Sequence, residues 1–569
     1  MSKILYVCLR DASQAAATAT AVTAIADRLL PDNIDRTPSR ILNSGGIVTG
    51  ISNPSDLIAA RGTSLAAGFL VEPGAWEHPR TGRPDGAYAL FRSDDAVVEI
   101  VTDTLASRTV WYVLTDRMFI ASTSQRAIVA LLGTFEFNPA VVPWMLATGT
   151  LGPGLSWDKR IHHVAGATTV TLDRRSWTVV ERTEPTQFVA EPASDDEFER
   201  RASDALKHVI GAAHVADPLW AITLSGGVDS RVILSLLQDT RGLRAVTWGV
   251  RASLNDPMND AQVARRLAGK FGLEHQYFET DLTSEPVDRV FDRFVANGEG
   301  RIDRLSGYMD GFQLWSRMVD SGIRGIIRGD QVFGHKPVRK PLDVRKRVGL
   351  TLWSDFEALP PLERFGLQPA SLPEGLQQAT GESLETWRDR LQQQFRVPFV
   401  LGALSDLKLP YVEIIDPLLS GSVIDLIRQV PDGLRTRKEL LKRLARSMSP
   451  EIPFATTVAI QAGDDILKSS SVVELLADTL SSQNALSVIP AELAAHAIAG
   501  LAVSTPPSSR VPIGRRLRQT AQALAPSWAA RLRARVPPTP LLHQNRIAFR
   551  AYLVARTTAL LRQDASLLS

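Results

Sequence analysis

The segment from Ser225 to Ser230 combines residue types that can hold a phosphate group. Gly226 and Gly227 carry no Cβ, so their backbone N–H groups can approach an anion closely, while Ser225 and Ser230 add hydroxyl donors. Asp229 supplies a carboxylate, the oxygen ligand that Mg²⁺ prefers, and it suits an anion that arrives with this metal. The segment therefore predicts a cradle for a magnesium-bound phosphate or pyrophosphate.

The neighbouring residues predict the elements that position this cradle. Residues 220–224 form an apolar run short enough for a buried parallel strand, and the apolar residues from Val228 to Leu237 recur at helical spacing. The N-terminus of that helix adds backbone N–H groups to the cradle. A second strand at 243–249 and a helix that begins near Asn259 complete a βαβ unit. Such a unit implies a parallel sheet, which binds ligands at the carboxyl ends of its strands.

Length and composition limit the class of protein. A chain of 569 residues is too long for one core and predicts two to four domains. The net charge of +3 is small and argues against a nucleic-acid partner. Cys8 is the only cysteine, which excludes an internal disulfide and a cysteine-based zinc site and favours a cytoplasmic protein. No apolar stretch approaches the length of a membrane span, so no membrane association is expected.

The loop resembles the pyrophosphate-binding loop of the N-type ATP pyrophosphatases, which cleave ATP between the α and β phosphates. Residues 1–185 are β-rich, and the order of the segments 85–91, 103–108 and 119–122 is similar to that in the glutaminase domain of the asparagine synthetase family. The resemblance covers about residues 1–470. It implies an α+β, Ntn-hydrolase-like sandwich of the glutaminase fold, followed by an α/β domain whose parallel sheet is of the adenine-nucleotide α-hydrolase (PP-loop) type.

The resemblance also divides the chain and exposes departures from the family. We expect a degenerate glutaminase-like domain at 1–185, an adenylating domain at 186–500 and a basic, Pro-rich helical extension at 501–569. The glutaminase nucleophile is an N-terminal cysteine, for which this chain offers Ser2, and Thr123 stands where the family has a glutamate. Cys8 lies inside an apolar run and is expected to be a buried core residue. The first domain is therefore expected to keep the fold without hydrolysing glutamine.

The resemblance implies ATP and Mg²⁺ as cofactors and assigns residues to them. Asp330 falls on the aspartate that shares the metal with Asp229, and Gln331 replaces its acidic neighbour. Two carboxylates from separate strand ends can grip one magnesium ion on a leaving pyrophosphate. The residues expected to contact the nucleotide are Leu224, Ser225, Gly226, Gly227, Asp229, Ser230, Trp248, Gly249 and Gly329.

Two catalytic positions carry open alternatives. Glu413 matches a family glutamate that helps to deprotonate an attacking amine, and it is either that base or a structural carboxylate. The family's pyrophosphate lysine is missing, since residues 455–461 contain no cation. Something must neutralise the charge on the leaving pyrophosphate, and the candidates are Lys438 and Lys468.

The resemblance implies an ATP-dependent, AMP-forming ligase that joins an amine to an adenylated carboxylate. A lost glutaminase centre is shared by lasso-peptide macrolactam synthetases and β-lactam synthetases. The basic stretch 336–350 and the Pro-rich stretch 506–540, with Arg510, Arg515, Arg516 and Arg518, favour the lasso-type enzyme, because a peptide substrate uses more surface. Expected partners are a peptide or small-molecule carboxylate and a leader peptidase or recognition protein of the same pathway. Three alternatives remain: an ammonia-using asparagine synthetase, a β-lactam-synthetase-type small-molecule cyclase and a non-catalytic nucleotide-binding scaffold.

Overall fold

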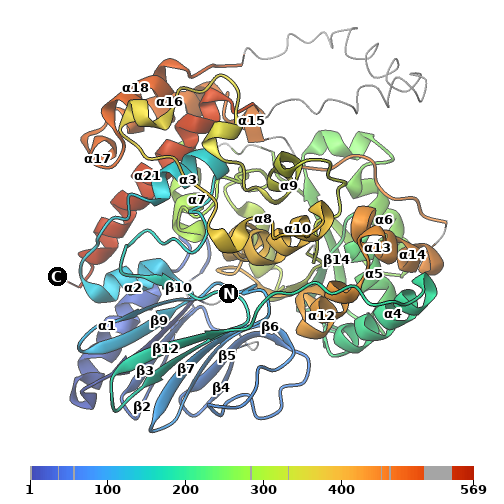
Figure 1. Cartoon of the computed structure of the whole chain (residues 1–569), viewed down its shortest axis with the longest axis horizontal. Helices are drawn as coiled ribbons and strands as arrows, with labels where there is room; N and C mark the ends of the chain where they lie inside the picture. Colours follow the sequence, from blue (N-terminus) through green and yellow to red (C-terminus); the bar gives the residue numbers. More distant parts are fainter. Residues whose placement is uncertain are drawn as a thin grey trace.

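Three sheets and the helices that cover them make up this mixed α/β protein (Figure 1). The computed structural model describes residues 3–35, 37–55, 58–281, 283, 285–330, 332–449, 451–460, 463–504 and 541–568. The expectations for Ser2, Gln331, Gln461 and the segment 506–540 therefore lie outside the described residues. No helix in the described part of the chain is long and apolar enough to cross a membrane.

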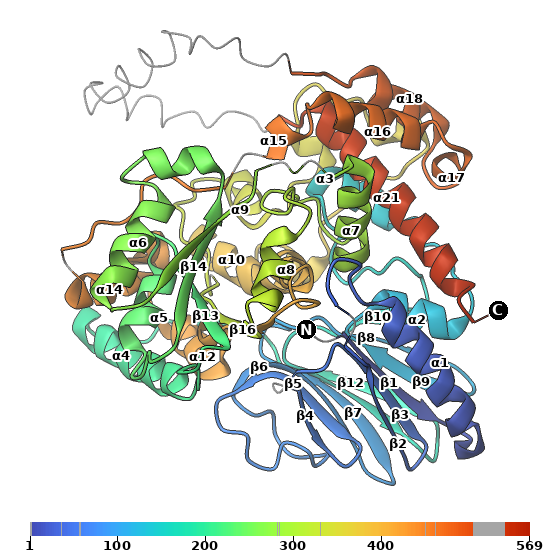
Figure 2. The ribbon, with the colours of Figure 1, turned by 180° about the vertical axis from the view of Figure 1, so that it is seen from behind.

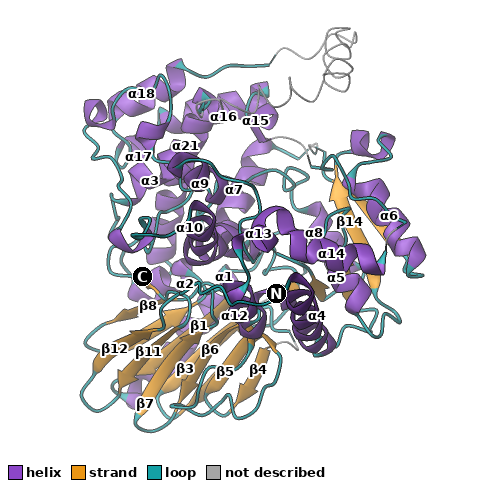
Figure 3. Ribbon diagram, turned by 45° about the vertical axis from the view of Figure 1, so that its right-hand side comes forward, coloured by secondary structure: helices purple, strands orange, loops and turns teal. Residues whose placement is uncertain are grey.

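Two six-stranded antiparallel sheets lie within residues 3–183, in the orders β10-β8-β9-β1-β3-β2 and β12-β11-β7-β6-β5-β4. Their strands are β1 Lys3–Leu9, β2 Arg40–Ser44, β3 Ile47–Ser52, β4 Ile58–Arg61, β5 Ser64–Leu70, β6 Gly86–Ser93, β7 Val97–Thr102, β8 Trp111–Leu114, β9 Met118–Ser122, β10 His162–His163, β11 Thr168–Asp173 and β12 Thr178–Thr183. Figure 3 shows the two sheets stacked at the base of the molecule, below most of the helices.

Strand β1 is largely apolar and does not alternate with polar residues, because both of its faces are covered. One face of β1, including Tyr6 and Cys8, packs into the core between the two sheets. The other face, including Leu5 and Val7, packs into the core beneath α1 (Ala15–Arg28) and α2 (Gln125–Leu132). Because both faces are covered, every residue of β1 is buried. This confirms Cys8 as a core residue, and burial raises the pKa of its thiol.

The third sheet is parallel and carries the candidate site. Its order is β15-β14-β13-β16-β17, with strands β13 Trp220–Thr223, β14 Arg244–Gly249, β15 His275–Glu279, β16 Gly325–Ile327 and β17 Glu413–Ile415. One face packs with α4, α5, α6, α12 and α14, and the other with α7 and α8 (Figure 2). The helices of the second half are α4 Asp195–Gly211, α5 Asp229–Leu236, α6 Asp260–Lys270, α7 Val287–Gly298, α8 Gln313–Asp320, α9 Pro341–Val348, α10 Leu384–Leu391, α11 Gly402–Asp406, α12 Gly421–Gln429, α13 Asp432–Arg435 and α14 Glu439–Met448.

A small layer of helices lies at the top of the molecule as drawn in Figure 1. It contains α15 Gly463–Ile466, α16 Ser470–Leu480, α17 Gln483–Leu486, α18 Ala491–Ala499 and the long α21 Gln544–Ala565. The last helix, α21, runs back across the protein and packs against α2, α3 (Val141–Thr148) and α7 as well as α16, α17 and α18 (Figure 2). The last helix therefore packs against elements from early, middle and late parts of the sequence.

Candidate functional site

A cavity of about 390 Å³ opens at the carboxyl ends of β13, β14 and β16. This is the edge of a parallel sheet at which ligands bind in α/β proteins. Eight of the residues predicted from the sequence line it, and they are Leu224, Ser225, Gly227, Asp229, Ser230, Trp248, Gly329 and Lys438. Gly226, Gly249, Asp330 and Glu413 are not among its lining residues.

The loop from Ser225 to Ser230 has backbone N–H groups whose present acceptors an anion can replace. The N–H of Ser225 donates to Ser230 Oγ at 3.2 Å, and the N–H of Gly227 donates to Ser225 Oγ at 3.2 Å. The N–H of Gly226 donates to the carboxylate of Asp260 at 3.2 Å, and burial raises the pKa of that carboxyl. These acceptors are side chains rather than parts of a ladder or helix, so a phosphate can replace them without disrupting secondary structure. The loop therefore fits a phosphate group.

The glycines at this edge serve two different purposes. A Cβ at Gly226 would overlap Ala455 and lie 2.8 Å from Val263, so this glycine allows the 455–460 segment to pack on the loop. Gly249 has the same role, since a Cβ there would overlap Ala459. Neither glycine lines the cavity. The N–H of Gly226 nevertheless belongs to the donors of the loop, so the contact of both glycines with a nucleotide stays a prediction. A Cβ at Gly227 would meet only Ser225 Oγ, at 3.1 Å, and this glycine lines the cavity.

Alanine substitutions should separate these purposes. We expect Gly227→Ala to fold normally but to bind ATP about tenfold more weakly, because its methyl group enters the cradle. Gly226→Ala should instead reduce the free energy of unfolding by about 1–3 kcal/mol through overpacking. Equilibrium dialysis with ATP and urea unfolding of each variant would check both. Tight ATP binding by Gly227→Ala would show that the loop does not hold phosphate.

Lys438 supplies a cation to the cavity from a distant part of the chain. Its Nζ forms an ion pair with the carboxylate of Asp229, and the lysine is 8% exposed. The chain reaches this position through Arg437 and Lys438 at φ +61° and +59°, a left-handed conformation that costs non-glycine residues about 1–3 kcal/mol each. The N–H of Arg437 donates to the carbonyl of His335 at 2.5 Å and holds the bend. Lys468, the alternative cation, does not line the cavity.

The segment in which the family carries its lysine forms an apolar wall here. Val458, Ala459 and Ile460 line the cavity, and the N–H of Val250 donates to the carbonyl of Ala459 at 2.9 Å. Arg231 anchors the start of this wall from α5, donating to the carbonyls of Ile452 at 2.5 Å and Pro453 at 2.9 Å. The segment thus forms one wall of the cavity without contributing a cation to it.

The two predicted metal ligands occupy different surroundings. Asp229 presents its carboxylate to the cavity and fits a cation that enters with the nucleotide. Asp330 accepts a hydrogen bond from Arg328 Nη2 at 2.6 Å, and its own N–H donates to Asp416 at 2.9 Å. Among the described residues there is no group of three or more His, Cys, Asp or Glu side chains that could hold a metal. Of the two predicted metal ligands, Asp229 lines the cavity and Asp330 does not.

Asp416, Arg328 and Asp260 belong to this edge of the sheet and were not predicted from the sequence. Asp416 directly follows β17, as Asp330 comes shortly after β16, and burial together with the charge of Asp330 raises the pKa of Asp416 well above its usual range. Arg328 and Asp260 line the cavity at the carboxyl ends of β13, β14 and β16. An acidic residue just after an apolar strand was the signal that could have found Asp416.

Glu413 lies at the opposite end of β17 from Asp416. It pairs with Gly325 at the start of β16, so it is at the amino end of the parallel strands. It is 1% exposed, and Arg108 from the first domain donates to its carboxylate at 2.5 Å. Burial raises its pKa, but the Arg108 guanidinium outweighs this and brings the pKa down to about 2. Of the two roles left open, this placement favours the structural carboxylate over the base.

The low pKa of Glu413 predicts how stability depends on pH. Its ionised form stabilises the folded protein above pH 4.5, the ordinary value, and this contribution of about 3 kcal/mol is lost as the pH falls towards 2. We expect the free energy of unfolding in urea to fall more steeply below about pH 4.5 for the wild-type protein than for Glu413→Gln. Equal slopes would contradict the strong coupling to Arg108.

Thr123 stands where the resemblance places a glutamate. Thr123 is 5% exposed, and its Oγ1 accepts a hydrogen bond from the N–H of Ile4 at 2.9 Å. It therefore ties β1 to the end of β9. A threonine engaged with the backbone cannot take over the charge of a carboxylate.

Comparison with known proteins gives one informative match. Residues 201–306 match the family model of asparagine synthase, a range that includes the phosphate loop but ends before Asp330 and Lys438. The match supports membership of the asparagine synthetase family and an ATP-dependent amide ligase of that family. No curated protein matches the chain.

Two solved structures show only a weak likeness. One is the allosteric regulatory enzyme of purine biosynthesis, at 9% identity and a TM-score of 0.21 over 59% of this chain and 82% of that one. The other is glutamine phosphoribosylpyrophosphate amidotransferase from B. subtilis complexed with ADP and GMP, at 9% identity and a TM-score of 0.20 over 59% of this chain and 83% of that one. At these scores neither carries an argument about this protein.

Proposed function

We propose that this protein is an AMP-forming carbon–nitrogen ligase that uses ATP to adenylate a substrate carboxylate, which an amine then attacks to give an amide. The observation that carries the proposal is the meeting of the phosphate loop, Asp229 and Lys438 around one cavity at the carboxyl edge of the parallel sheet. The asparagine synthase match over the loop supports the same reaction class.

The lining residues suggest how the nucleotide is held. The N–H groups and hydroxyls of the Ser225–Ser230 loop bind the phosphates, while Trp248 and Leu224 form the side of the cavity that suits the adenine ring. A magnesium ion on Asp229 would supply further neutralisation of the phosphate charge. Lys438 faces the same carboxylate and is placed to stabilise pyrophosphate as it leaves.

The attacking amine must lose a proton, and the carboxyl pair Asp330–Asp416 is a better candidate for that task than Glu413. The pair adjoins Arg328, which lines the nucleotide cavity, and the pKa of Asp416 is raised. When ionised, a carboxylate with a raised pKa is a stronger base than one at its ordinary value. We therefore assign Asp416, with Asp330, the role of proton acceptor.

The proposed substrate is a peptide, which would make the protein a macrolactam synthetase of the lasso-peptide type. Within the basic stretch, Lys336, Arg339, Lys340 and Arg347 are exposed and offer a positively charged surface to an acidic peptide. The same proposal includes a first domain that has the glutaminase fold but no glutaminase activity. It also includes a cytoplasmic location and a leader peptidase as partner. The departures at Ser2 and Thr123 support an amine other than glutamine-derived ammonia.

Pyrophosphate release from ATP and Mg²⁺ tests this function. The assay is run with core peptides that contain Asp or Glu, with aspartate and ammonium, and with no acceptor, beside an Asp229→Ala control. We expect release that depends on a peptide and disappears in the control. Release with aspartate and ammonium alone would indicate an asparagine synthetase, and ATP binding without release under every condition would indicate a scaffold.

A further inference from the structure

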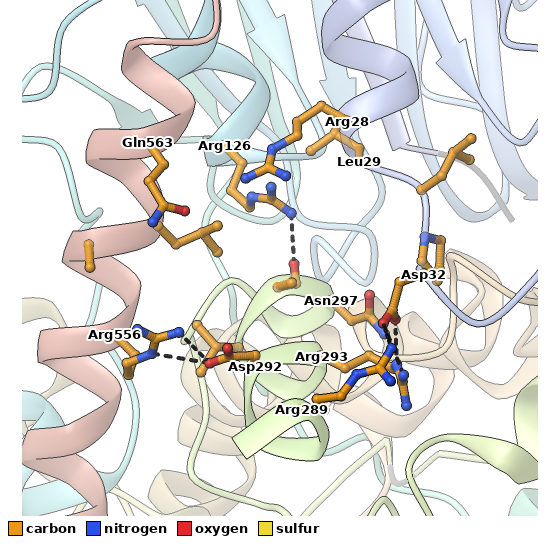
Figure 4. Close-up of a pocket in the computed structure, with 16 residues that line it drawn as sticks. Arg28, Leu29, Asp32, Arg126, Arg289, Asp292, Arg293, Asn297, Arg556 and Gln563 are labelled. Carbon is orange, nitrogen blue, oxygen red and sulfur yellow. Dashed lines mark hydrogen bonds and ion pairs between the residues drawn. The ribbon is translucent and has the colours of Figure 1, made fainter. Parts of the chain in front are cut away.

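A second cavity, of about 340 Å³, lies where the first and last parts of the chain meet. Its walls come from the end of α1 with residues 29–32, from α2, from α7 and from α21 (Figure 4). It shares no lining residue with the nucleotide cavity. The fold therefore builds a separate chamber from segments that are hundreds of residues apart in the sequence.

Positively charged side chains dominate this chamber. Five arginines line it, namely Arg28, Arg126, Arg289, Arg293 and Arg556. The carboxylates that accompany them are Asp32 and Asp292 in the lining and Glu285 and Asp564 behind it. The lining itself thus carries five guanidinium groups and two carboxylates.

Arg28 and Arg289 make fewer hydrogen bonds than the carboxylates around them. Asp564 accepts from Arg126 at 2.6 and 3.0 Å, and Asp292 accepts from Arg556 at 2.5 and 3.1 Å. Arg28 reaches Asp564 only through Nε, at 3.3 Å, and Figure 4 shows its guanidinium group pointing into the cavity. A guanidinium has five N–H donors, so Arg28 retains donors directed at the open space.

Arg289 on α7 is held more loosely still. Its guanidinium lies 3.6 Å from Asp32 and 3.9 Å from Glu285, beyond hydrogen-bonding distance. Leu29, Leu30 and Leu560 add apolar surface between the charged groups. A cavity with spare guanidinium donors, an excess positive charge and an apolar side is suited to a small organic molecule that carries an oxyanion.

We propose that this chamber is a binding site for a small organic oxyanion, a carboxylate or phosphate ester whose charged group pairs with Arg28. Its apolar part lies against Leu29, Leu30 and Leu560. Asn297, which also lines the chamber, donates to the hydroxyl of Tyr411 at 3.1 Å, two residues before β17. The chamber thus contacts the segment just before the amino end of β17, and the proposal stands whether or not the ligase function is correct.

Binding of two probes to the full chain tests the proposal. Citrate represents carboxylates and inorganic phosphate represents phosphate groups, and each is titrated by calorimetry at constant ionic strength. We expect saturable binding of at least one probe, weakened about tenfold in Arg28→Gln by the loss of charge-assisted hydrogen bonds. Arg289→Gln tests the contribution of a second arginine of the same site to probe binding. The matched control is Arg200→Gln on α4, since Arg200 is 64% exposed and Arg289 is 62% exposed.

The nucleotide cavity needs its own control because it also binds anions. Lys438→Gln should leave binding of the favoured probe at the Arg28 site unchanged. Failure of both probes to bind would overturn the proposal. So would binding that falls in Lys438→Gln but stays intact in Arg28→Gln and Arg289→Gln, because the anion would then occupy the nucleotide cavity.

Discussion

Replacing Lys438 with alanine is expected to reduce ATP-dependent pyrophosphate release by about 100-fold or more. Lys438 is a cation that lines the nucleotide cavity, and it faces the carboxylate of Asp229. A fixed positive charge in a partly dry site stabilises charge that develops on a leaving group far more than the same charge in water. The measurement is initial-rate pyrophosphate release at saturating ATP, Mg²⁺ and acceptor.

Two other lysines serve as controls for this loss. Lys468→Ala tests the alternative cation, and Lys442→Ala removes a charge one turn further along α14. Neither residue lines the cavity, so both variants should keep nearly full activity. Lys438→Arg should retain part of the rate because it keeps the charge with a different shape. Full activity in Lys438→Ala together with loss in Lys468→Ala would assign the pyrophosphate to Lys468 instead.

Replacing Arg108 with methionine is expected to reduce the free energy of unfolding by about 3–5 kcal/mol. Arg108 and Glu413 have side chains that are 7% and 1% exposed, and they join the first domain to β17 of the parallel sheet. Removing the guanidinium leaves a carboxylate buried without its counter-charge, which is more costly than the loss of one hydrogen bond. Urea unfolding monitored by tryptophan fluorescence would measure the change.

An exposed ion pair supplies the matched control for this variant. Arg80 pairs with Asp94 at 2.8 Å, but their side chains are 58% and 37% exposed. Arg80→Met should therefore alter stability by no more than about 1 kcal/mol. The double variant Arg108→Met/Glu413→Leu should recover much of the loss, since it leaves no buried charge. A stable Arg108→Met variant would mean that Glu413 is not held as a buried ion, and the base role would be reopened.

Local sequence patterns predicted the parts of the protein that depend on short-range order. The apolar runs at 220–224 and 243–249 correspond to β13 and β14, and the β-rich character predicted for residues 1–185 agrees with strands β1 to β12. The same patterns placed the phosphate loop between a strand and a helix. Such features are readable because the periodicity of apolar residues and the freedom of glycine act within a few residues.

Other residues show what such patterns leave open. Glu413 begins the short strand β17 and Asp416 directly follows it, and only the pairing of Glu413 with Gly325 shows which of them lies at the ligand-binding edge. Gly226 and Gly249 have the residue type that a nucleotide site favours, yet Ala455 and Ala459 pack against them. Register and packing decide these cases, and both depend on partners remote in the sequence.

The sequence by itself determined the phosphate-binding loop, the strands around it and the class of chemistry, because these depend on residue type and spacing over a few positions. Only the tertiary structure showed that Lys438, 209 residues from Asp229, lies against the Asp229 carboxylate. It alone showed that Glu413 is a buried ion and that α1, α2, α7 and α21 enclose an arginine-lined chamber. The physical reason is that charges are positioned by packing between distant segments, which local periodicity does not encode.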